Sequence, residues 1–320
     1  MNKLKNNNLK KVALVGTGFV GMSFAYALLN SGECDQLVLI DINKVKAHGE
    51  AMDMNHGLPF AKRNMLIFDG EYCDCCDADI VVIAAGVAQK EGEDRISLLK
   101  RNYEVFKSII DPIIKSGFDG VFLVATNPVD IMTKITQELS GFDPSHVIGS
   151  GTTLDTARLR YLLGDYFSID PRNVHAYVIG EHGDSEIIPW SQAYITTKKI
   201  HDIIDSSNNK FKFEDLYKIS KNVTEAAQEI IRAKSATYYG IGMALVRIVR
   251  AIFGDEKSAL TVSVMLKGQY GIEDVYAGLP AIIGRNGVED IIVLDLKENE
   301  RTAFIESCNF LKETAKEIGF

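Results

Sequence analysis

The chain lacks the apolar runs and the basic excess that a membrane protein or a nucleic-acid-binding protein needs. Its 320 residues carry a formal net charge of −8, which argues against nucleic acid or an anionic membrane surface as the main partner. No apolar run approaches the roughly 20 residues that a membrane span requires. The first ten residues are rich in Asn and Lys without an apolar stretch, so we expect a loosely ordered arm over 1–10 and no secretory signal.

Cysteine is scarce and unevenly placed, which bears on metal binding and on the redox compartment. There are five cysteines: Cys73, Cys75 and Cys76 lie close together, while Cys34 and Cys308 stand alone. Three thiols could begin a metal site, but no second cluster supplies the remaining ligands. An odd cysteine count without a signal peptide is typical of a reducing compartment. We therefore expect reduced thiols, no metal, and a cytoplasmic protein.

Short apolar runs alternate with helix-forming stretches through the first half of the chain. The runs read as buried strands because their polarity does not alternate, and this is typical of a parallel sheet that is covered on both faces. The expected strands are 11–15, 37–40, 80–85, 121–125 and 146–148, and the expected helices are 22–30, 98–116 and 129–139. This order predicts an α/β, doubly wound Rossmann domain over residues 1–149.

The pattern changes after about residue 150, which predicts a second domain over 150–320. We expect strands at 174–179 and 186–195, a helical region over 214–253 that breaks near Gly240, strand-rich chain at 260–292, and a final helix over 298–318. Turn signals such as Asn286-Gly287 favour antiparallel pairing of the late strands. The second domain is therefore predicted to be α+β.

A glycine-rich turn follows the first expected strand and opens the first expected helix. Gly16 allows a tight turn, Gly18 lets the backbone approach a pyrophosphate, and Gly21 lets the helix pack closely on the strand. Asp41 ends the second strand, 41 − 21 = 20 residues past Gly21, where a carboxylate would accept hydrogen bonds from the adenosine ribose. Its charge would repel a 2′-phosphate, so the sequence predicts NAD rather than NADP.

Five polar side chains at other places indicate proton and hydride chemistry. His182 lies in Gly-Glu-His-Gly-Asp, and a histidine changes charge near neutral pH. Asp155 and Arg158 are three residues apart, which places them on one helical face. Arg95 and Asn127 follow consecutive strands of the predicted sheet, at the edge where such folds bind ligands. Each residue taken singly is more often structural than catalytic.

Motifs spread from about Lys11 to the C-terminus make the chain similar to the lactate/malate dehydrogenase family. They are the glycine turn, AGVAQKEGEDR, ATNPVD, GTTLDTARLR, IGEHGDSE, ATYYGIG and YGIEDVYAGLP. The resemblance implies an enzyme that transfers a hydride between NAD and a small L-2-hydroxy acid. It also favours a catalytic role for the five polar residues together over five separate structural roles.

The resemblance implies a role for each of these five residues. His182 would donate a proton to the substrate carbonyl and take it back in the reverse reaction, while Asp155 would hold the imidazole in its tautomer and stabilise its cation. Arg158 would bind the substrate carboxylate through two parallel hydrogen bonds. Arg95 would polarise the carbonyl, and Asn127 would help to orient the substrate.

The resemblance also implies further contacts to the cofactor and the substrate. Thr237 and Ile241 would line the pocket near the substrate and the nicotinamide. Besides Gly16, Gly18, Gly21 and Asp41, the residues at cofactor-contact positions are Val20, Lys46, Tyr72, Gly86, Val87, Ser108, Ala125, Asn127, Ser150 and Ile241.

Gln89 stands at the position that separates substrates within this family. Malate enzymes carry an arginine there, which pairs with the second carboxylate of oxaloacetate. A neutral glutamine leaves that carboxylate uncompensated in a closed pocket, and an unpaired buried charge costs several kcal/mol. Pyruvate brings only a methyl group to this end of the pocket, so we expect pyruvate and lactate as the substrates.

Arg160 and His175 match positions that bind fructose 1,6-bisphosphate across a subunit interface in the bacterial members that respond to this effector. The resemblance therefore implies a homotetramer that the sugar bisphosphate activates, because the phosphates would neutralise like charges from two subunits. An interface Arg and His that bind nothing are the alternative.

Other functions stay open on the sequence alone. The chain could be a malate dehydrogenase or another L-2-hydroxyacid dehydrogenase, although Gln89 argues against the first. It could also be a non-catalytic protein that binds NAD as a sensor, which the presence of His182, Asp155, Arg158 and Arg95 disfavours.

Overall fold

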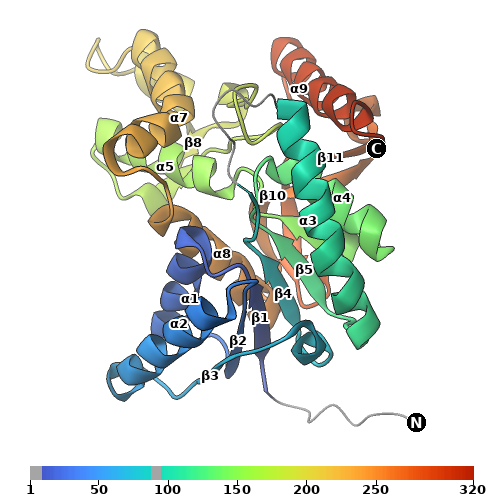
Figure 1. The fold of residues 1–320 in the computed structure, drawn as a ribbon. Helices are drawn as coiled ribbons and strands as arrows, with labels where there is room; N and C mark the ends of the chain where they lie inside the picture. Colours follow the sequence, from blue (N-terminus) through green and yellow to red (C-terminus); the bar gives the residue numbers. More distant parts are fainter. Residues whose placement is uncertain (1–8, 88–94) are drawn as a thin grey trace.

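A nine-stranded sheet runs through the computed structural model, which describes residues 9–87 and 95–320 (Figure 1). Within the described chain the strand order is β12-β11-β10-β6-β5-β4-β1-β2-β3. Six neighbouring strands of this sheet, from β6 to β3, are parallel to one another. Strands β10, β11 and β12 pair antiparallel with one another, and β10 also pairs antiparallel with β6. One continuous sheet therefore contains both halves of the chain.

The parallel half has the predicted doubly wound form. Its strands are β1 (Lys11–Val15), β2 (Gln36–Ile40), β3 (Leu66–Asp69), β4 (Ile80–Ile83), β5 (Val121–Val124) and β6 (Val147–Gly149). Its helices are α1 (Phe19–Ser31), α2 (Lys44–Gly57), α3 (Arg95–Ser116) and α4 (Val129–Ser140). Every residue of β1, β4, β5 and β6 is buried, as expected for strands that are covered on both faces.

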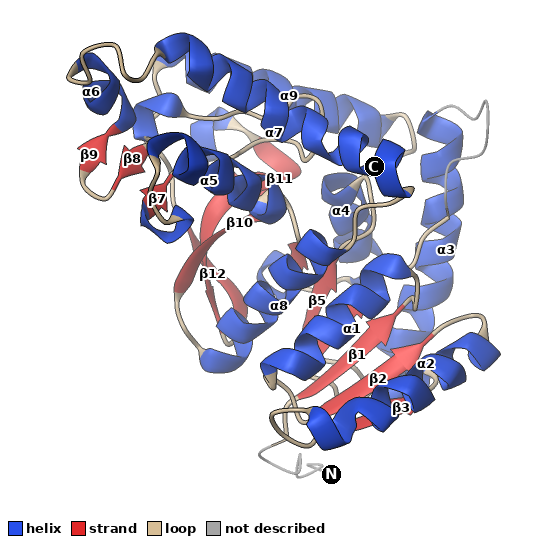
Figure 2. Cartoon of the chain, turned by 90° about the vertical axis from the view of Figure 1, so that its left-hand side faces the viewer, coloured by secondary structure: helices blue, strands red, loops and turns tan. Residues whose placement is uncertain are grey.

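Helices cover the two faces of the parallel half in separate groups. On one face α1 packs against α8 (Tyr239–Gly254), and on the other α3 packs against α4 (Figure 2). Helix α1 begins at Phe19, three residues before the predicted start, because the glycine turn leads directly into it. Each crossover returns the chain to the same end of the sheet, so the carboxyl ends of β1, β4, β5 and β6 form one edge.

The antiparallel half extends the same sheet beyond β6. Strands β10 (Ser258–Lys267), β11 (Glu273–Gly284) and β12 (Gly287–Ile291) form a meander. Strand β10 joins β6 through the pair Ser263 and Gly149. A Cβ on Gly149 would lie 2.4 Å from Thr133 Oγ1 and 2.7 Å from the Cβ of Ser263, so this junction has no space for a larger residue.

The rest of the second half stands beside this meander. It contains α5 (Thr153–Phe167), α6 (Ile200–Asp205), α7 (Phe213–Lys234), α9 (Glu298–Lys316) and a small sheet of β7 (Val174–His175), β8 (Tyr194–Ile195) and β9 (Lys198–Lys199). Short 3-10 turns are Leu58–Phe60, Tyr72–Cys75, Pro144–His146, Pro171–Asn173, Trp190–Gln192 and Gln269–Gly271. A second buried apolar cluster, separate from that of the main sheet, lies among α5, α7 and β7.

One expectation for this region is wrong in detail. The ranges 174–179 and 186–195 are not continuous strands: only β7, β8 and a bridge between Ile179 and Ile187 form. Pro189 has no N–H to donate and is followed by a 3-10 turn, which interrupts the second range. The expected break near Gly240 is present: residues 235–238 separate α7 from α8, Ser235 is left-handed with φ 71°, and Gly240 is the second residue of α8.

The described residues show the state of the cysteines and bear on metal binding and on membrane crossing. All five thiols are free, with Cys34, Cys75 and Cys308 buried and Cys73 exposed. In the described ranges no group of three His, Cys, Asp or Glu residues is arranged to hold a metal ion. No helix of residues 9–87 and 95–320 is both long and apolar enough to cross a bilayer.

Candidate active site

His182, Asp155 and Arg158 meet in one hydrogen-bonded group. The Nδ1 atom of His182 lies 2.6 Å from Asp155 Oδ2, and Arg158 Nη1 donates to Asp155 Oδ1 at 2.7 Å. Asp155 lies in the first turn of α5 and is 2% exposed. Its spacing of three from Arg158 places both on one helical face, as the sequence predicted. One buried carboxylate thus contacts both cations.

These contacts set the protonation of the histidine. Burial would raise the pKa of Asp155, but the neighbouring His182 and Arg158 outweigh burial and lower it. Burial would lower the pKa of His182, yet the charge and the hydrogen bond of Asp155 outweigh burial and raise it to about 9. The ring is therefore a cation at neutral pH, and Asp155 is an anion.

The main chain around His182 is fixed by contacts to three distant segments. Gly180, with φ 89°, exchanges two hydrogen bonds with Gly278. Glu181 N–H donates to Ser307 Oγ at 2.9 Å. His182 N–H donates to Asp130 Oδ2 at 2.9 Å. Sequence reasoning did not single out Asp130, although it is the last residue of ATNPVD.

The structure describes only some of the other predicted substrate contacts. Asn127 is exposed at the carboxyl end of β5, and Thr237 is half-buried between α7 and α8. Across the described ranges, neither hydrogen-bonds His182. Arg95 is the first residue of α3, and its side chain lies outside the description. Gln89 lies outside the described residues altogether.

The glycine turn has the predicted close approaches. Gly16 has φ 100°, and a Cβ there would lie 2.5 Å from Ala85 N. A Cβ on Gly21 would lie 1.9 Å from Gly16 O, so the start of α1 can pack here only with glycine. A Cβ on Gly18 would meet nothing within 4 Å. The Gly18 backbone is therefore open, and a phosphate group can approach it at the helix N-terminus.

Asp41 lies beside this turn with its carboxylate fixed. Its Oδ2 accepts from Thr17 N at 2.7 Å and from Thr17 Oγ1 at 2.8 Å, and its Oδ1 accepts from Asn43 N at 2.8 Å. Burial would raise the pKa of Asp41, but these hydrogen bonds outweigh burial and lower it. Lys46 Nζ donates to Thr17 O at 2.5 Å. A carboxylate with a lowered pKa next to an open backbone suits a ribose and disfavours a 2′-phosphate.

The remaining predicted cofactor contacts lie mostly along one edge of the sheet. Gly86 and Val87 follow β4, Ala125 follows β5, and Ser150 follows β6. Val87 N–H donates to Asn102 Oδ1 at 2.9 Å, which anchors this segment to α3. The others lie on helices or turns: Val20 is the second residue of α1, Tyr72 begins a 3-10 turn, Ser108 is exposed on α3, and Ile241 is half-buried on α8.

Arg160 and His175 occupy neighbouring segments on the side of α5 and β7. Arg160 Nε donates to Ala176 O at 3.1 Å, and its guanidinium lies 5.1 Å from the ring of Tyr177. Burial lowers the pKa of Arg160. His175, which precedes Ala176, is exposed. The backbone contact brings the two predicted effector residues close together.

The doubly wound sheet and its open glycine turn define a dinucleotide-dependent oxidoreductase. The chain belongs to the lactate/malate dehydrogenase family. Residues 10–149 match the family's NAD binding domain, and residues 152–319 match its alpha/beta C-terminal domain. NAD is therefore the cofactor, as predicted.

Individual relatives cover nearly the whole chain. It is 53% identical to L-lactate dehydrogenase 2 of Bacillus cereus over 306 residues, 96% of this chain and 97% of that one. It is 54% identical to L-lactate dehydrogenase of a Geobacillus species over 310 residues, 97% of each chain. A lactate dehydrogenase crystal structure from a Medee basin deep-sea metagenome library gives a TM-score of 0.96 at 53% identity, covering 98% of this chain and 99% of that one. The ligand-bound minor L-lactate dehydrogenase of Enterococcus mundtii gives 0.95 at 44% identity, covering 97% and 98%. These neighbours confirm the predicted fold class.

Proposed function

We propose that the chain is an L-lactate dehydrogenase, which reduces pyruvate reversibly to (S)-lactate with NADH in fermentative glycolysis in the cytoplasm. The observation that carries this proposal is the buried carboxylate of Asp155 between His182 and Arg158. It places a proton donor and a carboxylate-binding cation side by side. The names of the Bacillus and Geobacillus relatives support the same activity.

In this proposal His182 acts as the general acid. NADH, when bound, supplies the hydride to the carbonyl carbon of the substrate. The Nε2–H of the His182 cation donates its proton to the carbonyl oxygen, and Asp155 keeps Nδ1 protonated so that the ring faces the substrate in the correct tautomer. Since the pKa of His182 is raised to about 9, the ring already carries this proton at neutral pH. In lactate oxidation the neutral ring takes the proton back.

Arg158 is the proposed binding site for the substrate carboxylate. One of its Nη1 hydrogens bonds Asp155, which leaves donors for two parallel hydrogen bonds to a carboxylate. The side chain is 14% exposed, so its charge is only weakly screened. Arg95 is proposed to polarise the carbonyl, Asn127 to orient the substrate, and Thr237 to line the pocket.

The cofactor site is proposed to follow the glycine turn and the adjoining strand ends. Gly18 would receive the pyrophosphate, and Asp41 the adenosine ribose. The remaining proposed contacts are Gly16, Val20, Gly21, Lys46, Tyr72, Gly86, Val87, Ser108, Ala125, Asn127, Ser150 and Ile241.

A spectrophotometric assay of NADH oxidation tests the proposed reaction. We expect turnover with pyruvate, a lower kcat/KM with oxaloacetate, and loss of turnover in His182→Asn with NADH binding retained. A preference for oxaloacetate would make the chain a malate dehydrogenase. NADH binding without turnover of any 2-oxo acid would make it a sensor.

A homotetramer is proposed as the working assembly, with fructose 1,6-bisphosphate as its activator at Arg160 and His175. An apolar face on α1 and α8 supports self-association: Phe19, Tyr26, Tyr239 and Met243 are 64–70% exposed. They line the apolar part of a groove of about 980 Å³, whose lining also includes the proposed cofactor residues Gly18 and Lys46. Large exposed apolar patches of this kind are typical of subunit interfaces, and we assign this one to a second copy of the chain.

A further inference from the structure

Asp130 is a buried carboxylate that contacts the backbone of His182, whereas Asp155 contacts its ring. It lies in the first turn of α4 and is 2% exposed. Its Oδ2 accepts from the backbone N–H of His182 at 2.9 Å, and its Oδ1 accepts from Ser263 Oγ at 2.5 Å. One side chain thus joins α4, the histidine segment and β10.

The surroundings of Asp130 stabilise its charge only partly. The N-terminus of α4 and the two hydrogen bonds favour the anion. Burial nevertheless dominates and raises the pKa of Asp130 to about 6. At neutral pH the group is therefore mostly an anion, and it adds a second negative charge near His182.

Other charged groups also face this region. Asp155 and Arg158 approach His182 from α5, and Glu181 lies beside it in the chain. Glu186, whose pKa burial raises to about 7, accepts from Thr224 Oγ1 at 2.8 Å and also acts on His182. A test of Asp130 must therefore separate its charge from those of Asp155 and Glu186.

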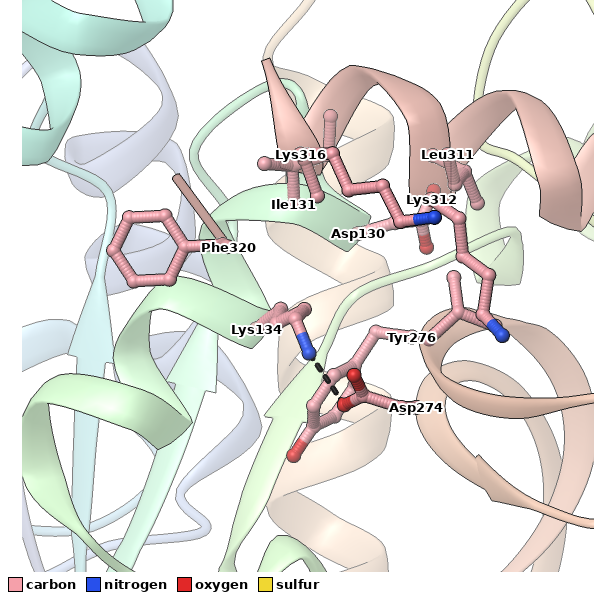
Figure 3. A pocket seen from close by; sticks show the side chains of 11 residues that line it. Asp130, Ile131, Lys134, Asp274, Tyr276, Leu311, Lys312, Lys316 and Phe320 are labelled. Atoms are coloured by element: carbon pink, nitrogen blue, oxygen red, sulfur yellow. Dashed lines mark hydrogen bonds and ion pairs between the residues drawn. The ribbon is translucent and has the colours of Figure 1, made fainter. Parts of the chain in front are cut away.

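Behind Asp130 is a small cavity of about 100 Å³ that lies among α4, β11 and α9 (Figure 3). Lys134 reaches across it to Asp274 at 2.5 Å, while Lys312 and Lys316 extend from α9. These lysines line the cavity, but within the described chain none of them forms an ion pair with Asp130. Asp130 therefore depends on Ser263 and the His182 N–H for its hydrogen bonds.

We propose that Asp130 is a positioning residue for the acid–base histidine: it holds the His182 backbone so that the ring meets Asp155, and its charge helps to keep the ring protonated. The proposal rests on the proposed dehydrogenase function. The two parts of the role differ in what they require. Holding the backbone needs only an acceptor atom, whereas keeping the ring protonated needs the negative charge.

Two substitutions separate the acceptor from the charge. In Asp130→Asn, the amide oxygen can still accept from His182 N–H while its NH2 group donates to Ser263 Oγ. We expect the pKa of His182, measured by NMR of the ring, to fall by roughly one pH unit. The alkaline limb of kcat/KM for pyruvate should move by the same amount, with turnover near pH 6 close to that of the wild type.

Asp130→Ala removes the acceptor as well as the charge. We expect kcat to fall by roughly tenfold or more at every pH, because a small displacement of a catalytic group is costly. The KM for NADH should stay unchanged. Ser263→Ala is the matched control, since it removes a hydrogen bond from Asp130 but leaves the contact with His182 N–H, and it should retain the His182 pKa.

The wild-type protein gives a measurement that does not depend on any variant folding. The backbone amide of His182 should show a chemical-shift change near pH 6 as Asp130 titrates, separate from that of its own ring. An unchanged His182 pKa in Asp130→Asn, or a His182 amide whose pH titration is the same in Asp130→Asn as in the wild type, would overturn the proposal. If the wild type fails to reduce pyruvate, the proposed function fails, and these two NMR results still decide the role of Asp130.

Discussion

Protonation at the candidate site is decided by one carboxylate of very low exposure. Asp155 contacts both His182 and Arg158, so its charge is shared between the proposed proton donor and the proposed substrate-binding cation. Burial alone would favour a neutral histidine. The pairing with Asp155 reverses that preference, so the His182 ring carries its proton at neutral pH before any substrate binds.

The pH dependence of the two reaction directions should be opposite. The pKa of His182 is raised to about 9, so kcat/KM for pyruvate should decrease as the pH rises through about 9. The same parameter for lactate should increase over that range, because the neutral ring is the base. Initial rates from pH 6 to 10 in both directions measure this.

Replacing Asp155, the carboxylate that contacts His182, should shift the pH profile of kcat/KM. In Asp155→Asn the pKa of His182 should fall by about 1–3 pH units, and kcat for pyruvate should fall by roughly 10²- to 10⁴-fold. An alkaline limb that stays near pH 9 in this variant would contradict the assignment of His182 as the group that titrates.

The choice of 2-oxo acid should follow the charge at residue 89. Gln89→Arg should raise the ratio of kcat/KM for oxaloacetate over pyruvate by roughly 10²- to 10³-fold, because it pairs a carboxylate that is otherwise buried without a partner. Gln89→Met, which is neutral and of similar length, is the control. Equal ratios in the two variants would show that residue 89 does not face the substrate.

The residues of the site were predictable to different extents. Asp155 and Arg158 could be paired from the sequence, since a spacing of three fixes their helical face. The meeting of His182 with Asp155 spans 27 residues and was expected only from the family resemblance. Asp130 lies 52 residues from His182 in sequence, and its contact is with the backbone. No side-chain pattern in a single sequence indicates such a contact.

At the scale of elements, the turn before α1 separates two uses of glycine. Gly21 is needed for packing, because its Cβ would lie 1.9 Å from Gly16 O. Gly18 is open and has an ordinary φ of −73°, so the folded apoprotein can accept a side chain there. The two positions are three residues apart, yet their substitution should have different consequences.

We expect Gly21→Ala to lower the free energy of unfolding by about 1–3 kcal/mol or more, from steric conflict.

Gly18→Ala should leave the Tm of the apoprotein nearly unchanged but weaken NADH binding, because the methyl group occupies the space for the pyrophosphate. Thermal denaturation and fluorescence titration with NADH measure the two effects. Equal NADH affinity in Gly18→Ala and the wild type would place the phosphates elsewhere.

The secondary structure could be predicted best where burial is uniform. The five expected strands of the parallel half are short apolar runs, and their positions were correct to within one or two residues; β3, whose residues are partly exposed, was not predicted. The segment 186–195 is also rich in apolar residues, but Pro189 and a 3-10 turn divide it. Its conformation depends on packing against α5 and α7, which local sequence does not encode.

At the scale of the whole molecule, the apolar face on α1 and α8 should decide the assembly. Met243→Glu places a charge in the groove that we assign to a second copy, so light scattering should show smaller species than in the wild type. Tyr217→Glu, on the exposed side of α7, is the control. A wild type that is already monomeric would refute the proposed tetramer.

The effector response should depend on Arg160 and His175. Arg160→Gln and His175→Gln should each abolish the decrease in KM for pyruvate caused by fructose 1,6-bisphosphate, since each removes a phosphate partner. Arg250→Gln, an exposed cation on α8, should retain the response. A saturation curve for the wild type that the bisphosphate leaves unchanged would remove this proposal.

The junction at Gly149 and Ser263 also limits how this protein can be recombined with its relatives. The two halves meet there as neighbouring strands with no spare volume. A hybrid gene that takes its front portion from one species and its rear portion from another must therefore bring compatible small residues to both sides. Shuffled libraries made with this chain should yield soluble hybrids mainly where that pair is inherited together.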